Sequence, residues 1–121
     1  MSKDKVRIKR AYVPADSDDG YRVFVDRLWP RGIAKQDLKF DRWDKDLAPS
    51  PALRKWFGHK MENWDHFRES YENELRQPEQ QQRMRELIQA AEHGPLTLVY
   101  AARDEEHNHA RVLAAEIMRL Y

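Results

Sequence analysis

The chain of 121 residues has no cysteine, only four glycines and no long apolar segment. The absence of cysteine excludes disulfides, thiolate zinc sites and cysteine nucleophiles. The mean hydropathy of -0.98 and the lack of a long apolar run exclude a membrane-spanning helix. Because no apolar segment follows Met1, the sequence also predicts no secretory signal. We therefore expect a cytoplasmic protein.

Large apolar residues are also scarce, since Val, Ile, Leu and Phe account for 24 of the 121 residues. This composition lies near that of disordered chains. Two observations favour a folded protein instead. The 22 Lys and Arg nearly balance the 21 Asp and Glu, and four Trp and five Tyr supply large side chains for a core. At this length we expect one domain spanning residues 1–121.

Apolar patterns predict three strands. Alternation near the amino terminus predicts a half-buried strand with Val6, Ile8 and Tyr12 on its inner side. Continuous apolar runs predict buried strands over residues 21–28 and 96–101. Between the second and third strands, the sequence favours helices.

The first of four expected helices has clear ends, with Ser50 as N-cap, Pro51 in the first helical position and Gly58 as the stop. Its apolar face is expected to hold Leu53, Trp56 and Phe57. Other helices are expected over residues 61–75, over residues 84–91 with Gly94 as C-cap, and from about Glu106 to the C-terminus. One helical turn over residues 36–40 and core positions at Trp43 and Leu47 are also expected. This order predicts a small single-domain α/β fold, with a sheet that is at least partly parallel and about four helices.

Polar residues gather where the last predicted strand passes into the last helix. Arg103 leaves the strand, Asp104 is placed to cap the helix, and His107 and Asn108 follow. Strand ends of this kind are where α/β proteins place ligand sites. We interpret Arg103 and Asn108 as ligand-binding residues, and His107, oriented by Asp104, as a group for proton transfer. The same residues could instead cap the helix, pair with one another or contact solvent.

Two further arginines, Arg27 and Arg31, flank the Trp-Pro turn that ends the second predicted strand. If that strand lies parallel to the last one, Arg27, Arg31 and Arg103 face one crevice. Three guanidinium groups there need either carboxylates, which Asp26 and Asp104 could supply, or a bound anion. The sequence thus predicts a crevice for a small ligand that carries phosphate or carboxylate.

Residues for catalysis are less clearly marked. His59 follows a helix-ending glycine and is a second candidate for proton transfer, although it could equally stabilise the helix end. The cap position of Ser50 explains that residue without chemistry, so no nucleophile is apparent. A general acid–base step and a non-catalytic binding module both fit. His107 and His109 point to nearly opposite sides if helical, and we expect neither a metal nor a cofactor.

A basic amino-terminal segment supports a different class of function, nucleic-acid binding or regulation. Its cations are Lys3, Lys5, Arg7, Lys9 and Arg10. The chain is not basic overall, and it shows neither a recognition helix nor an aromatic platform. The small anionic ligand is therefore the favoured partner and nucleic acid the alternative, while the sequence leaves the oligomeric state open.

Three stretches carry a family resemblance. They read Asp19-Gly20-x-Arg22-Val23-x-Val25-Asp26-Arg27-Leu28-Trp29-Pro30-Arg31-Gly32, then Leu47-Ala48-Pro49-Ser50-x-x-Leu53-Arg54-x-Trp56-Phe57-x-His59, and Thr97-Leu98-x-Tyr100-Ala101-Ala102-Arg103-Asp104-x-x-His107-Asn108-x-Ala110. With these residues the chain resembles the domain of unknown function 488 family, in its YeaO-like branch. The resemblance implies a small α/β protein and brings no established activity. Relatives in the broader family carry two cysteines near the third stretch, so their thiol chemistry is not expected here.

Overall fold

The computed structural model describes residues 5–121. Within this part of the chain, four strands form one sheet in the order β1-β4-β2-β3, and every neighbouring pair is parallel. The strands are β1 (Val6–Arg10), β2 (Tyr21–Phe24), β3 (Arg42–Trp43) and β4 (Leu96–Tyr100). The α-helices are α1 (Pro51–Phe57), α2 (Trp64–Leu75), α3 (Pro78–Ala90) and α4 (His109–Met118). The predicted α/β class is confirmed.

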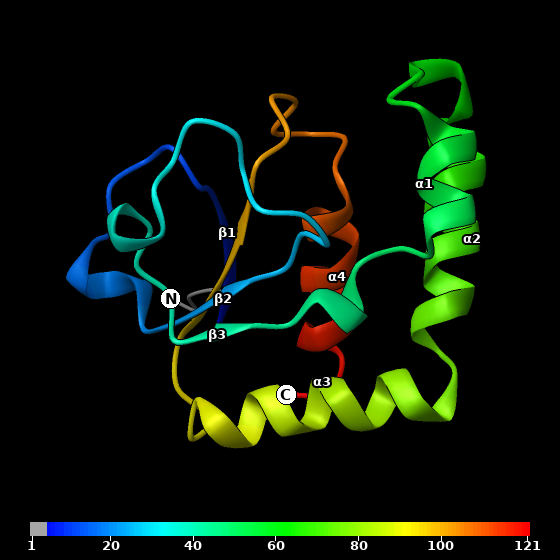
Figure 1. The fold of residues 1–121 in the computed structure, drawn as a ribbon. Coiled ribbons are helices and arrows are strands. Elements are labelled where there is room, and N and C mark those ends of the chain that lie inside the picture. Colours follow the sequence, from blue (N-terminus) through cyan, green and yellow to red (C-terminus); the bar gives the residue numbers. More distant parts are fainter. Residues whose placement is uncertain (1–4) are drawn as a thin grey trace.

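The two faces of the sheet have different covers. On one face, Val6, Val23 and Leu98 pack with buried residues of the four helices in the larger core. On the other, Phe24 and Val99 pack with residues of the connecting segments in a smaller core. Figure 1 shows the helices to the right of and below the sheet and the blue and cyan loops to its left. We call these the helix face and the loop face. None of the described helices has the length and apolarity to cross a membrane.

All three predicted strands are shorter than expected, β4 by one residue because it ends at Tyr100. β1 ends at Arg10 because the chain turns away from the sheet, and Tyr12 is 46% exposed rather than buried. β2 ends at Phe24 rather than at residue 28, although the Val25 N–H still donates to the Val99 carbonyl at 3.0 Å. The chain beyond Val25 thus leaves the sheet at its carboxyl edge. The edge strand β3 was not predicted, because two residues are too few for a periodic pattern.

The ends of α1 are as predicted. The Ser50 hydroxyl accepts the Leu53 N–H at 3.3 Å, and Gly58 takes a left-handed φ of 53°. The expected core position of Trp56 is wrong: its side chain is 47% exposed, because only Phe57 of this short helix turns fully inward. Met61 is exposed as well, since the chain there forms a separate 3-10 turn before α2.

The other helix ends differ from expectation. α3 has its C-cap at Ala91 rather than Gly94, and Glu92 and His93 take the positive φ values of the turn. α4 begins at His109, because the side chain of Asn108 caps it by accepting the Arg111 N–H at 3.0 Å. The expected one-turn helix over residues 36–40 is a 3-10 turn, Lys35–Asp37. Leu47 is fully buried and Trp43 packs in the smaller core, as predicted.

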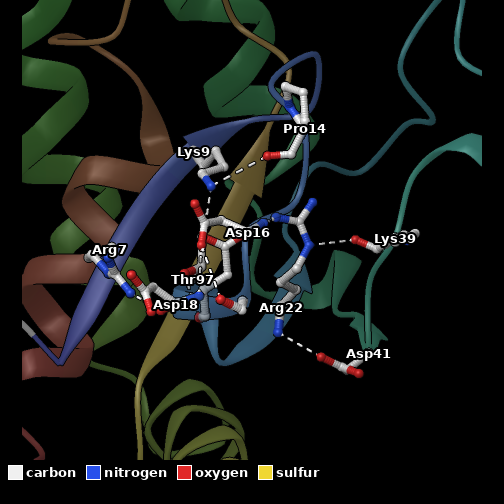
Figure 2. Close-up of polar contacts among 11 residues, drawn as sticks. Arg7, Lys9, Pro14, Asp16, Asp18, Arg22, Lys39, Asp41 and Thr97 are labelled. Carbon is white, nitrogen blue, oxygen red and sulfur yellow. Dashed lines mark hydrogen bonds and ion pairs between the residues drawn. The ribbon is translucent and has the colours of Figure 1, made fainter.

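A buried ion cluster ties the connecting segments to the loop face. Asp19, almost fully buried, lies 2.7 Å from the Lys9 amine and 2.5 Å from the Arg22 guanidinium. The Thr97 hydroxyl donates to the Asp19 carbonyl at 2.7 Å, and Arg22 donates to the Lys39 carbonyl at 2.7 Å. Figure 2 shows the basic side chains of β1 and β2 directed toward the turn over residues 16–19. Side chains of three strands therefore hold the loops in place.

Candidate anion-binding pocket

The carboxyl ends of β2 and β4 open into one pocket of about 780 Å³. The two strands are adjacent and parallel, so their ends meet at one edge of the sheet. Residues of α1 and the start of α4 complete the wall. Arg27, Arg31 and Arg103, the three arginines singled out in the sequence, all line this pocket. Their geometry meets the condition for a shared crevice, while their role in binding stays a prediction.

Two more cations, Arg54 and Lys55 of α1, line the same pocket and were missed in the sequence. Their helix was predicted, but nothing local indicates that its polar side faces the strand ends. The five cations come from three separate segments of the chain. Among residues 5–121, none of the five forms an ion pair with a carboxylate. The lining thus carries positive charge that the described part of the protein does not neutralise by direct pairing.

Arg27 contributes a buried donor that has no acceptor. Its Nη2 donates to the Pro49 carbonyl at 3.3 Å and reaches the Ala48 carbonyl at 3.5 Å. Its Nε is buried and has no hydrogen-bond partner in the described chain. A buried donor left unpaired costs about 1–3 kcal/mol.

Among residues 5–121, Asp26 is the one acidic residue of the lining, and its oxygens join strand ends. Its Oδ2 accepts the Ala101 N–H at 3.0 Å, and its carbonyl accepts the Trp43 indole N–H at 2.7 Å. Its Oδ1 lies 3.1 Å from His109 Nε2, outside good hydrogen-bond geometry, while that nitrogen is also 3.2 Å from the Val25 carbonyl. Asp26 therefore connects β2, β3, β4 and α4. It does not neutralise an arginine, which corrects one of the two arrangements considered from the sequence.

The histidines predicted for proton transfer lie in different places. His59 lines the pocket, with its ring centroid 5.7 Å from that of Phe57. His107 is not part of the lining: its Nδ1 lies 3.1 Å from Asp104 Oδ2, and its ring meets Trp64 edge-on. Asp104 therefore does orient His107, but outside the pocket. The imidazole that lies beside Asp26 in the pocket is that of His109, a residue the sequence reasoning considered only as a metal ligand.

Asp104 and Asn108 are occupied by the turn before α4. Asp104 does not cap the helix but accepts the Glu106 and His107 N–H groups, at 2.9 and 3.0 Å. These two backbone donors lower the pKa of its carboxyl below 3.8. Asn108 lines the pocket, yet its side-chain oxygen caps α4 and its amide donates to the Asp104 carbonyl at 2.8 Å. The predicted binding role of Asn108 thus competes with a structural one.

The basic amino-terminal segment is largely engaged with its own fold. Arg7 donates to the Asp18 carbonyl, and Lys9 pairs with Asp19. Arg10 donates to the Ala102 carbonyl at 2.9 Å. Lys3 lies outside the described residues, and Lys5 is exposed. Nucleic-acid binding stays an untested alternative.

Within residues 5–121, no group of three or more His, Asp or Glu is arranged to hold a metal ion.

The fold and the site define a small parallel α/β protein with a cationic pocket at its strand ends. A family model described as "Inactive DUF488-N3 subclade" matches residues 5–121, and the chain belongs to this family. The chain is 50% identical over 109 residues to "Uncharacterized protein YeaO" of Escherichia coli, covering 90% of this chain and 93% of that protein. It is 42% identical over 114 residues to "Uncharacterized protein Rv3073c" of Mycobacterium tuberculosis, covering 94% of each. The family resemblance seen in the sequence is thus confirmed. No solved structure matches the chain.

Proposed function

We propose that this protein binds a small ligand carrying phosphate or carboxylate in the pocket at the ends of β2 and β4. The observation that carries the proposal is the set of five cations that pair with no carboxylate among residues 5–121, namely Arg27, Arg31, Arg54, Lys55 and Arg103. Guanidinium groups match phosphate and carboxylate oxygens in geometry and charge. The proposal keeps the cytoplasmic location expected from the sequence.

Binding without turnover is the form of this function that we favour. The Asp104–His107 pair lies outside the lining, and the hydroxyl of Ser50 is engaged by Glu74 at 2.7 Å. The Asp26 side chain is held between Ala101 and His109. The word "Inactive" in the description of the family model agrees with this choice. If a reaction is found, His59 stays a candidate for proton transfer, and His109, which lines the pocket beside Asp26, is a new one.

The proposal is tested by thermal unfolding with inorganic phosphate and with citrate, at constant ionic strength set with chloride. We expect both probes to raise the Tm of the native protein and to have little effect on Arg103→Ala. A ligand at a hundred times its Kd stabilises by about 2.7 kcal/mol, a shift on the order of 10 °C at this chain length.

Arg85→Ala is the matched control, because Arg85 is exposed on α3 and outside the pocket lining. It removes the same charge and should keep the full response to phosphate. If neither probe stabilises the native protein, the proposed function is wrong. If Arg85→Ala and Arg103→Ala reduce the rise in Tm equally, the proposed function is also contradicted, since the response to phosphate would then follow net charge rather than the pocket.

A further inference from the structure

The pocket has more than cations in its lining. Its volume of about 780 Å³ is in the range of cavities that enclose whole organic ligands, well beyond the needs of a single phosphate or carboxylate group. Four aromatic side chains line it, Tyr12, Trp29, Phe57 and Phe67. Leu28, also in the lining, is 66% exposed. A free inorganic anion would leave this apolar part of the wall unused.

Tyr12 is an exposed ring held in a fixed position. Its hydroxyl donates to the Arg31 carbonyl at 2.9 Å, and the Arg10 guanidinium lies 4.8 Å from its ring centroid. The side chain is nevertheless 46% exposed, so these contacts do not bury it. A ring that is already ordered loses little conformational entropy when a ligand packs on it. Tyr12 also stands beside the backbone of one pocket arginine, Arg31.

Trp29 is fixed even more firmly. Its indole N–H donates to the Ile33 carbonyl at 2.6 Å, and its ring meets those of Phe24 and Trp43 with centroids 5.6 Å apart in each case. The helix side of the pocket offers a second rigid pair, since Phe57 and Phe67 stack with centroids 4.3 Å apart. Because Phe57 and Phe67 are buried, the ring surface open to a ligand is that of Tyr12 and Trp29.

We infer that the pocket takes an organic anion with an aromatic or heteroaromatic ring, its phosphate or carboxylate on the arginines and its ring against Tyr12 and Trp29. This inference rests on the proposed function, because it names the class of ligand for the same site. Planar rings pack favourably on aromatic side chains and on guanidinium planes, whereas a saturated ring of equal size gains less.

The test is calorimetric titration of the full chain with phenyl phosphate, cyclohexyl phosphate, inorganic phosphate and benzoate. We expect phenyl phosphate to bind about fivefold to tenfold more tightly than cyclohexyl phosphate, the scale of one aromatic contact. Tyr12→Ala should bring the ratio of these two Kd values close to one. Tyr12→Phe keeps the ring and loses only the hydroxyl, so it should keep the ratio. The benzoate arm tells carboxylate from phosphate as the anionic group.

Trp56→Ala serves as the control, because Trp56 is equally exposed but lies outside the pocket lining. It should leave the ratio unchanged. Equal affinities for phenyl and cyclohexyl phosphate, or a ratio that Tyr12→Ala does not alter, would overturn the inference while leaving anion binding in place. If no phosphate or carboxylate probe binds, the proposed function fails with it. The two failures are therefore distinguishable.

Discussion

Replacing Gly20 with alanine is expected to lower the free energy of unfolding by about 3 kcal/mol or more. Gly20 has φ 67° and ψ −135°, a combination that residues with a Cβ rarely adopt. A Cβ built there would lie 2.3 Å from the backbone oxygen of Pro95. That approach is required because the Tyr21 N–H donates to the same oxygen at 3.0 Å, which sets β2 beside β4.

Gly32→Ala is the control that measures the cost of the positive φ without a steric clash of the new Cβ. Gly32 also has a positive φ, 77°, but no atom lies within 4 Å of the position of its Cβ. Gly32→Ala should therefore lower the free energy of unfolding only by the backbone strain, about 1 kcal/mol. Urea unfolding followed by tryptophan fluorescence gives both values, provided that the m-value stays constant. If the two variants lose the same stability, close contact with Pro95 is not the cause.

Removing the Asp19 carboxylate, as in Asp19→Ala, is expected to lower the free energy of unfolding by about 3–5 kcal/mol. Both carboxylate oxygens are used: Oδ1 pairs with Lys9, and Oδ2 with Arg22 and the Asp16 N–H. Without Asp19, the buried Arg22 guanidinium loses its counter-charge. Asp18→Ala is the control, since Asp18 is exposed in the same turn. A similar loss in both variants would show that the turn, and not the ion pair, is what matters.

The same carboxylate predicts a dependence on pH. Burial opposes ionisation of Asp19, but the bonds from Lys9, the Asp16 N–H and Arg22 outweigh it and lower the pKa below 3.8. A lowered folded-state pKa gives stability that is present above the unfolded value, about pH 4, and is lost as the pH falls through the folded value. Asp19→Asn should flatten this loss, measured by urea unfolding between pH 3 and 5. Asp104, whose pKa is also lowered, is present in both proteins and does not contribute to the difference.

The sequence predicted three of the cations that line the pocket but not the other two. Arg27, Arg31 and Arg103 follow directly from parallel strand ends, because that rule needs only the ends of two strands. Arg54 and Lys55 could not be placed in this way. Their position depends on how α1 packs on α2, through the stacked rings of Phe57 and Phe67, which no local pattern reveals.

Short segments account for most of the errors. In α1, seven residues make two turns, and the spacing of Leu53, Trp56 and Phe57 cannot tell a buried face from its margin. Tyr12 has the right parity for β1 but lies beyond its end. The sequence did not indicate that Asp26 and His109 lie together, because their contact joins residues 83 positions apart. By contrast, the Asp19-Gly20-x-Arg22 part of the family motif is explained by the fold alone, through the ion cluster and the approach to Pro95.

The sheet order places β1 and β3 at the two outer edges, and this has a consequence for how copies of the chain meet. An outer strand presents unpaired backbone groups that can template a strand of another molecule. β3 offers only two residues for such growth. β1 is longer, but the exposed cations Lys5 and Arg7 lie along it, so two such edges repel each other. The basic amino-terminal strand thus disfavours edge-to-edge aggregation, whether or not any nucleic acid binds there.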